Sequence, residues 1–435
     1  MFFRRAAVVV TIAVITAGFQ VPAHAGKYTP RPGVTYNSPV GTPAQKHKIL
    51  DKLLRSIRST PRGEDIRVMS WNIQSGGAVK ALLRAQRRGV QVRVLMSRSN
   101  AEAIDNRSWA RLDRGLKRGN AHRKPARRSW ARLCTSSCRG RTGAAHAKYF
   151  LFSRTGRARH VVIHGSANLT VASTGNQWND VYTTVNRDRP YRFFLNIFGQ
   201  MAKDRAVRHP FRGWSNGTDR FMFFPGPRRD PVMGLLNKVR CLHAANTRSH
   251  RTRLRIAPDV MREERGMALG KKIWRLWQNG CDLKVGYTVM GVSVGRMLRR
   301  PGPRGRGVPM RHLVQDLNGD GLFDRYFHLK SMSVRGNVGN DRSNWVTLNG
   351  SSNWSGRGYR SDENLGVHWR EGLTRQYEEH LNYWFSWPGF AQSDRSRMSA
   401  STSQAAIEEG RMVDGLLFGT GPINGVDPYA NVDMD

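Results

Sequence analysis

The chain has 435 residues, which is too long for one ordinary domain and suits two or three, and 39% of them are hydrophobic, enough for a sizeable core. Its formal net charge of +41 and its pI of about 11.4 say little about the fold. They favour polyanionic partners, which are nucleic acid, anionic lipid surfaces or other polyphosphates.

The N-terminus has the pattern of a secretory signal. Arg4 and Arg5 precede a short apolar run at residues 6–19, and the small residues "AHA" at 23–25 fit a cleavage site. The run is shorter than the roughly 20 residues that span a bilayer, which disfavours a membrane anchor. We expect residues 1–25 to be a signal peptide cleaved near Ala25, and the mature protein to be secreted.

Export changes what the four cysteines mean, because disulfides persist outside the cell. Cys134 and Cys138 lie close together in "LCTSSCRG", and Cys241 and Cys281 remain. We favour the pairs 134–138 and 241–281. Zinc ligation, which would want more neighbouring Cys or His, and free buried thiols are the alternatives.

Two stretches of the chain repeat one order of elements. In the first, apolar residues at helix spacing over 49–57 lead to a strand at 66–71, a helix at 77–89 and a strand at 90–96. The second stretch, 230–287, predicts a helix over 231–243, with Cys241 on it, and then continues in the same order. Its later elements are a strand at 253–258, a helix at 266–280 and a strand at 282–288. Helix–strand alternation at this spacing indicates an α/β sheet in each copy.

Each copy then carries a His-x-Lys pair and a Gly-Ser-x-Asn turn. The pairs are "HAKYFLFS" at 146–153 and "HLKSMSVR" at 328–335, and the turns are 165–168 and 350–353. Because residues i and i+2 face the same side of a strand, the His and Lys of each pair should project together.

These residue types suit chemistry on a phosphate diester. Lysine ammonium groups and asparagine amides can hold the phosphate oxygens, while one imidazole attacks phosphorus and the other protonates the leaving alkoxide. Neither role requires a metal, so no cofactor is expected for catalysis. Two copies of the pattern inside a duplicated fold make a shared site far more specific than a single His-x-Lys would be.

At these motifs the chain resembles the phospholipase D superfamily, in its exported bacterial form, over residues from about 40 to 390. The family motif is H-x-K-x4-D followed by G-S-x-N, and both copies depart at the Asp position, which is Ser153 and Arg335 here. The resemblance implies two duplicated α/β sandwich halves that form one active site at their interface. The catalytic residues that it implies are His146, Lys148, Ser166, Asn168, His328, Lys330, Ser351 and Asn353.

The family also has an acidic residue after G-S-x-N that orients a histidine, and Asp180 and Glu363 resemble it, at uneven spacing. The resemblance further implies a covalent phosphohistidine, for which we favour His146 over His328. With the signal at 1–25, the domains we expect are a first half over 26–225, a second half over 226–395 and an acidic tail over 396–435, which is either disordered or packed across basic surface.

Two kinds of charged loop accompany the motifs. Basic stretches at 111–134 and 296–311 follow the second strand of each repeat, and we expect both at the rim of the site. The segment "DLNGDGLFD" resembles the start of a calcium loop without its final Glu, and an Asx-rich turn is the alternative. Its candidate ligands for a structural calcium are Asp316, Asn318, Asp320 and Asp324.

The sequence therefore favours an exported phospholipase D-type phosphodiesterase that hydrolyses or transfers phospholipid head groups at an anionic membrane surface, as a monomer. An exported nuclease of the same superfamily is the main alternative, because the charge also suits nucleic acid. An inactive relative that only binds polyanions is the third.

Overall fold

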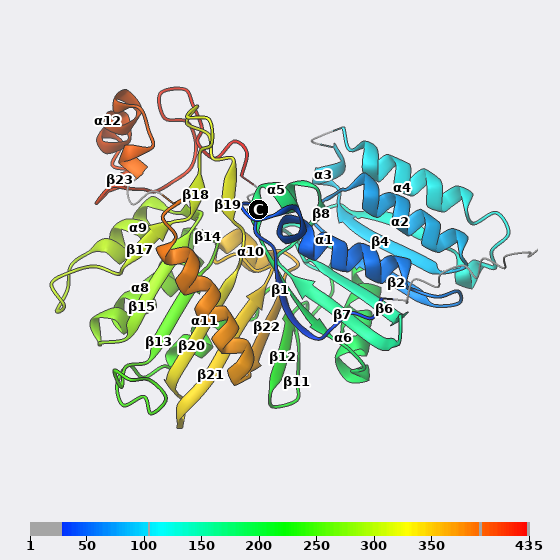
Figure 1. Ribbon diagram of the computed structural model, residues 1–435, viewed down its shortest axis with the longest axis horizontal. Helices are drawn as coiled ribbons and strands as arrows, with labels where there is room; N and C mark the ends of the chain where they lie inside the picture. The colour runs from blue at the N-terminus through cyan, green and yellow to red at the C-terminus, as the bar shows by residue number, and fades with distance from the viewer. Residues whose placement is uncertain (1–27, 103–104, 391–393, 433–435) are drawn as a thin grey trace, which may run out of the picture.

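Two large mixed β-sheets form the body of the protein in a computed structural model that describes residues 28–102, 105–390 and 394–432 (Figure 1). The expected signal peptide at 1–25 lies outside these residues. One sheet has seven strands in the order β1-β10-β7-β6-β2-β4-β5, and the other has eight in the order β11-β12-β22-β21-β20-β13-β15-β17. The two sheets lie side by side, one in each half of the molecule.

The seven-stranded sheet and its helices come from the first half of the chain. Its strands are β1 (Gly33–Tyr36), β2 (Asp65–Met69), β4 (Gln91–Ser97), β5 (Trp130–Cys134), β6 (Tyr149–Thr155), β7 (Ala158–Gly165) and β10 (Asp180–Thr184). Its helices are α1 (Pro43–Arg58), α2 (Gly76–Arg87), α3 (Ser99–Glu102), α4 (Arg107–Arg118), α5 (Ala172–Gly175) and α6 (Asp188–Met201).

The eight-stranded sheet is built from residues 212–369, so its first two strands precede residue 226, where we expected the second half to begin. Its strands are β11 (Arg212–Ser215), β12 (Asp219–Phe223), β13 (Arg253–Ala257), β15 (Asp282–Tyr287), β17 (Met310–His312), β20 (Ser331–Val338), β21 (Asp341–Gly350) and β22 (Asn364–Trp369). Its helices are α7 (Pro231–Asn237), α8 (Glu263–Gln278), α9 (Val292–Arg299), α10 (Gly356–Arg360) and α11 (Glu371–Ser386).

Short strands complete the structure near the junction of the halves and at the C-terminus. They are β3 (Ile73–Gln74), β8 (Leu169–Thr170), β9 (Gln177–Trp178), β14 (Val260–Met261), β16 (Val289–Met290), β18 (Val314–Gln315), β19 (Arg325–Phe327), β23 (Met412–Val413) and β24 (Leu416–Leu417).

The pairing of the strands confirms the duplication. Strand β2 pairs in parallel with β4 and antiparallel with β6, and β13 pairs in the same way with β15 and β20. In each sheet the antiparallel strand continues into a hairpin, β6–β7 or β20–β21, that carries the Gly-Ser-x-Asn turn at its end. The fold is the expected pair of α/β halves.

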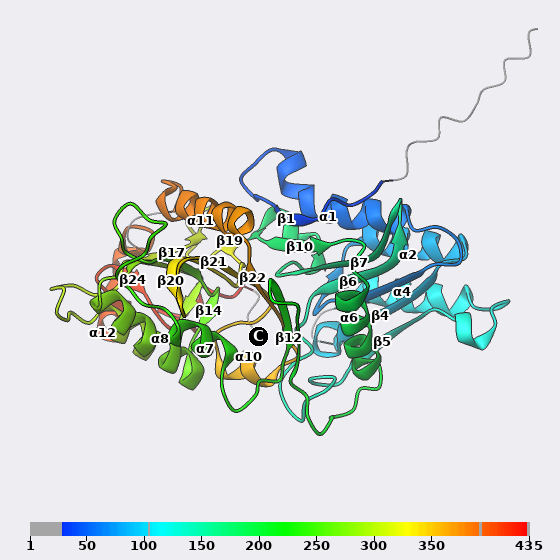
Figure 2. The same cartoon turned by 90° about the horizontal axis from the view of Figure 1, so that it is seen from below.

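Helices cover both faces of each sheet because the strands are apolar on both sides. In β2, Val68 packs with α1, α2 and α4, whereas Met69 packs with α6 on the other face. Around the second sheet, α7 and α8 lie on one face and α11 on the other (Figure 2). Helix α1 includes the apolar residues at 49–57 and begins at Pro43, because Thr42 and Gln45 form a capping box and proline suits the first turn.

Two local predictions need correction. The helix expected over 231–243 ends at Asn237, and Cys241 lies in the following loop, whose backbone bonds instead to β20 and to Thr252. The His-x-Lys pairs do not lie inside strands but directly before β6 and β20, where their backbone has partners in the other half of the molecule.

The C-terminal segment is folded and packs against the protein, which is the second of the two states expected of it. Residues 400–408 form helix α12 (Ala400–Glu408), and Tyr429 and Asp394 both contact the buried His312. Asp414 forms an ion pair with Arg299 at 2.7 Å, so the segment packs across part of the basic stretch 296–311.

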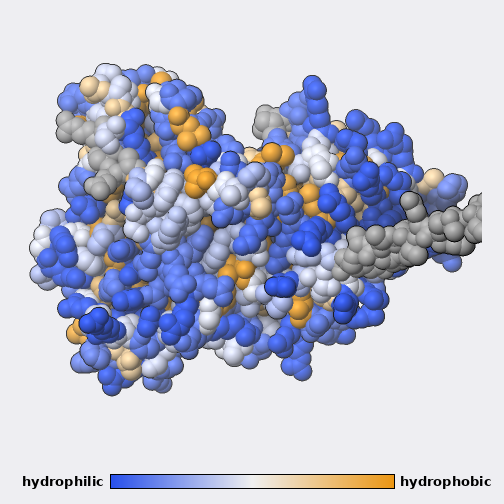
Figure 3. All heavy atoms as spheres, viewed as in Figure 1, coloured by the Kyte–Doolittle hydropathy of each residue, from blue (hydrophilic) through white to orange (hydrophobic). Residues whose placement is uncertain are grey.

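The face drawn in Figure 3 is mostly hydrophilic, with hydrophobic side chains scattered singly over it. Within the described ranges, the helices are all too short or too polar to cross a bilayer.

Both expected disulfides are present, Cys134–Cys138 and Cys241–Cys281, which excludes zinc ligation and free thiols for these four residues. The second bridge joins the loop after α7 to the residue before β15, across a sequence separation of 40, whereas the first spans only 4.

We expect loss of the Cys241–Cys281 bridge to destabilise the protein more than loss of Cys134–Cys138. Loop-closure entropy gives about 4 kcal/mol for the longer loop and about 2 kcal/mol for the shorter one. Urea unfolding of the two double Cys→Ser variants measures both free energies. Equal midpoints for the two variants would contradict the expected order.

Candidate active site

The two halves exchange backbone hydrogen bonds at their motifs. The amide of His146 donates to the carbonyl of Asp362 at 3.1 Å, and the amide of Lys148 donates to the side chain of Asn364 at 2.7 Å. In the reciprocal contact, β19 pairs with β9, and the amide of His328 donates to the carbonyl of Trp178 at 3.0 Å. Each His-x-Lys segment is therefore held against the segment that follows the Gly-Ser-x-Asn turn of the other half.

Glu363 of the second half orients His146 of the first. The Glu363 Oε1 atom lies 2.7 Å from His146 Nδ1, and its Oε2 atom accepts a hydrogen bond from the hydroxyl of Ser351. All three side chains are buried. A carboxylate that accepts from Nδ1–H leaves Nε2 as the nitrogen with the lone pair, so the ring is set for attack through Nε2.

Asn179 of the first half occupies the corresponding place beside His328. Its Oδ1 atom lies 2.7 Å from His328 Nδ1 and accepts a hydrogen bond from Ser166 at 2.9 Å, while its Nδ2 atom faces acceptors of residues 173 and 177. The amide oxygen is thus the atom that contacts the imidazole. His328 Nε2 is buried without a hydrogen-bond partner among the described residues.

The prediction that Asp180 orients a histidine is therefore wrong. Asp180 lies one residue further on, at the position equivalent to Asn364, and its carboxylate accepts from Asn349 at 3.2 Å and from the Tyr377 hydroxyl. Burial raises its pKa above the ordinary value. The error is one of register, because "ND" at 179–180 corresponds to "EN" at 363–364, and a comparison of the starts of β10 and β22 would have found it.

The two lysines project into the same region and differ in their surroundings. Each ammonium donates to the carbonyl of its own histidine, at 2.6 Å for Lys148 and 3.0 Å for Lys330. The Lys148 ammonium also lies 5.6 Å from the centre of the Trp71 ring, whereas Lys330 forms a 2.7 Å ion pair with Asp259. Trp71 and Asp259 were not predicted from the sequence.

Burial, and then the lysine charges, hold the pKa of each histidine well below the ordinary value of 6.5. Both Lys148 and Lys330 act on both rings, which means that the four motif side chains share one electrostatic environment. Both imidazoles are accordingly neutral near pH 7 in the free protein.

The remaining motif residues support the same site. Asn168 accepts from Ser70, and its amide nitrogen is buried without a partner, as a phosphate-binding donor would be. Asn353 is buried at the equivalent turn, where Arg265 donates to its carbonyl.

The two residues at the family's Asp position have structural contacts. Ser153 accepts from the amide of Asp65 at 2.7 Å, and Arg335 donates to the carbonyl of Asn246 at 2.8 Å. The reacting groups are therefore assembled without the family's Asp.

The acidic loop forms a chain of Asx-type turns. Carboxylate oxygens of Asp316 accept from the amides of Gly319 and Gly321, and Asp324 accepts from the amide of Leu317. Asn318 donates to Asp320. Over the described ranges no group of three or more His, Cys, Asp or Glu side chains is arranged to hold a metal ion, and the structural calcium stays a prediction.

The basic stretches do not lie at the rim of the site, contrary to expectation. Arg127 pairs with Asp65 at the start of β2, and Arg304 donates to the carbonyls of Trp277 and Cys281, just before β15. These are the N-terminal ends of parallel strands, whereas the motifs lie beyond the C-terminal ends. The loops lead from a helix into a strand, which places them at the opposite edge.

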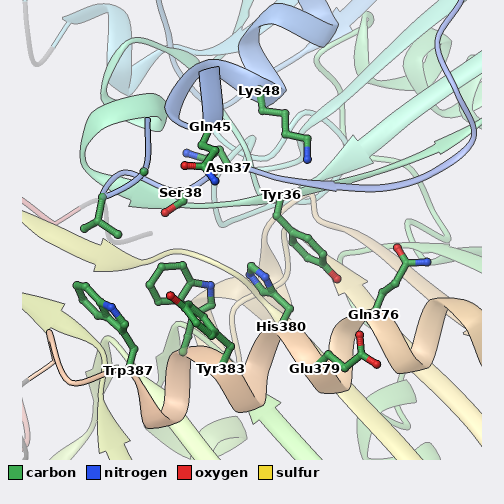
Figure 4. A pocket seen from close by; sticks show the side chains of 13 residues that line it. Tyr36, Asn37, Ser38, Gln45, Lys48, Gln376, Glu379, His380, Tyr383 and Trp387 are labelled. Carbon is green, nitrogen blue, oxygen red and sulfur yellow. The ribbon is translucent and has the colours of Figure 1, made fainter. Parts of the chain in front are cut away.

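A cavity of about 710 Å³ lies beside the site, between residues 36–48 and helix α11 (Figure 4). Its wall includes Tyr36, whose ring stacks on His380 with 3.7 Å between ring centres. Asn37 also lines it and accepts from the amide of Asn179 at 2.8 Å. Asn37 thus braces the residue that orients His328, which no sequence pattern indicated.

The comparisons with known proteins agree with this architecture. The family model described as "Cardiolipin synthase, PLD-like domain" matches residues 53–201. A phosphatidylserine synthase of Haemophilus influenzae has a TM-score of 0.53 at 12% identity, with 82% of this chain and 86% of that chain covered. No curated protein sequence matches.

A polyphosphate kinase of Porphyromonas gingivalis has a TM-score of 0.54 at 13% identity, with 81% of this chain covered. The alignment spans 50% of the length of that kinase. At these identities the likeness shows the fold alone.

The fold and the paired motifs define a two-half enzyme that acts on phosphodiester bonds. The match of residues 53–201 to a PLD-like domain supports assignment of the chain to the phospholipase D superfamily.

We predict that Asn179→Asp raises the pKa of His328, because a carboxylate beside Nδ1 favours the charged imidazole. In the wild type both site histidines should remain neutral to well below pH 6.5. Titration of imidazole NMR signals measures both values. Asn176→Asp is the matched control, since Asn176 is exposed and bonds to the carbonyl of Asp324. An unchanged His328 titration would contradict the contact with residue 179.

Proposed function

We propose that the protein is an exported phospholipase D-type phosphodiesterase that cleaves or transfers the head groups of phospholipids through a phosphohistidine intermediate. The observation that carries the proposal is the reciprocal pairing of His146 with Glu363 and of His328 with Asn179, in a buried site that also holds two lysines.

The unequal partners of the two histidines support different roles for them. His146 becomes positively charged when Nε2 bonds to phosphorus, and the Glu363 carboxylate at Nδ1 stabilises that charge. Asn179 is neutral and gives His328 no such stabilisation, so a protonated His328 readily releases its proton. His146 is therefore the nucleophile and His328 the general acid.

The reaction then takes two steps. His146 Nε2 attacks phosphorus, the bond from phosphorus to the leaving oxygen breaks, and His328 gives its proton to that oxygen. Water or an alcohol next loses a proton to His328 and attacks phosphorus, which breaks the phosphorus–nitrogen bond and restores His146. The substrate's negative charge raises the pKa of His328 when it binds, which supplies the acid form.

Lys148, Lys330 and Asn168 would hold the phosphate oxygens as negative charge develops on them. Donors fixed in a buried site stabilise this charge without reorganising.

Phospholipid is the preferred substrate class because the matching family model is described as a domain of cardiolipin synthase. Export rests on the signal pattern at 1–25. Because the basic stretches lie away from the site, they are less suited to bind substrate phosphate at its rim. Their charge remains suited to a distant polyanionic surface, and a nuclease is the outcome to test against.

We expect purified mature protein to release head group from phosphatidylcholine in the presence of EDTA. His146→Ala and His328→Ala should each remove nearly all turnover, and the double variant should be little worse, because residues that act as a unit are non-additive. His243→Ala, at a loop histidine remote from the motifs in sequence, is the control.

This assay tests the proposed substrate class and the proposed shared site through different outcomes. Cutting of DNA or RNA without head-group release would replace the phospholipase by a nuclease. Substantial activity in either single variant would contradict the shared site.

A further inference from the structure

The two halves differ at one position that touches the catalytic lysines. Trp71 and Asp259 each lie two residues beyond the end of equivalent strands, β2 at Met69 and β13 at Ala257. Trp71 presents a ring to Lys148, and Asp259 presents a carboxylate to Lys330. At this position one copy therefore places an aromatic ring beside its lysine, and the other places a carboxylate there.

The ion pair between Lys330 and Asp259 is fully buried, with 0% exposure of both side chains and 2.7 Å between the charged atoms. Charges at this separation interact strongly where water is excluded. The Glu363 carboxylate bonds to His146 and Ser351, whereas the Asp259 carboxylate contacts the ammonium of Lys330.

The backbone fixes Asp259 in this position. Its φ angle is +57°, a left-handed conformation that is costly for residues other than glycine, asparagine and aspartate. Its carbonyl accepts from the amides of Thr288 and Val289, at 3.0 and 2.9 Å. These two hydrogen bonds hold the residue in place beside Lys330.

We propose that Asp259 is a specificity-determining residue that sets the charge the site accepts. This inference rests on the proposed function. Asp259 adds one negative charge beside Lys330, which disfavours a phosphomonoester more than a phosphodiester. The monoester carries nearly two negative charges at pH 7, because its second pKa is about 6, whereas the diester carries one. The substrate is a diester and the hydrolysis product a monoester, so the ion pair promotes product release.

Asp259→Asn tests this charge matching with little change of shape. Asparagine tolerates the same φ angle and retains hydrogen bonding to Lys330, and the bound anion then supplies the counter-charge. Asp282→Asn is the matched control. It removes a carboxylate from an ion pair with Arg255, the central residue of β13.

The experiment measures the dissociation constants of ethyl phosphate and diethyl phosphate by calorimetry, at pH 5 and pH 7. The wild type should bind the two esters with similar affinity at pH 7. In Asp259→Asn the monoester should bind about tenfold more tightly relative to the diester at pH 7, since removal of one facing charge is worth at least about one pKa unit. That gain should shrink at pH 5, where the monoester carries one charge, and Asp282→Asn should show no gain.

Two results would overturn the role of Asp259 alone. One is a wild-type protein that binds the monoester more than tenfold more tightly than the diester at pH 7. This result can be observed without any variant. The other is an Asp259→Asn protein whose ester preference at pH 7 is unchanged. Failure of the wild type to bind either ester would instead overturn the proposed function together with this inference.

Discussion

The active site depends on one structural constraint, the exchange of hydrogen bonds between the segments that carry the motifs. Residues 145–148 are bonded to residues 362–364, and residues 326–328 to residues 177–179. Each half thus supplies the histidine and lysine of one motif and the side chain that orients the histidine of the other. Neither half contains a complete site, because its own histidine has its partner across the interface.

This constraint also explains why the two copies could diverge in charge while keeping their geometry. The backbone contacts are similar on both sides, but the side chain beside His146 is a carboxylate and the one beside His328 is an amide. Likewise Trp71 and Asp259 occupy one structural position with different chemistry. A symmetric scaffold thus places two imidazoles in unequal electrostatic surroundings.

Much of the fold could be predicted from local pattern. Residue spacing in the sequence indicated the repeated order of helix and strand and the paired His-x-Lys and Gly-Ser-x-Asn motifs. It also indicated the pairing of the two disulfides. The errors occurred where long-range pairing overrides local signals. The helix expected over 231–243 stops at Asn237 because the following backbone bonds to β20. The basic stretches lie at the N-terminal ends of the parallel strands, whereas the motifs lie beyond the C-terminal ends.

The sequence by itself determined which residue types meet, since a duplicated α/β pattern with two His-x-Lys pairs implies one shared phosphodiester site. Only the tertiary structure decided which side chain faces which. A shift of one residue moves a strand side chain to the other face, so the choice of Asn179 over Asp180 beside His328 depends on the register of β9 and β10. The contact of Asp259 with Lys330 joins residues 71 positions apart and leaves no periodic signal, because ion pairs form wherever the packed backbone brings two charges together.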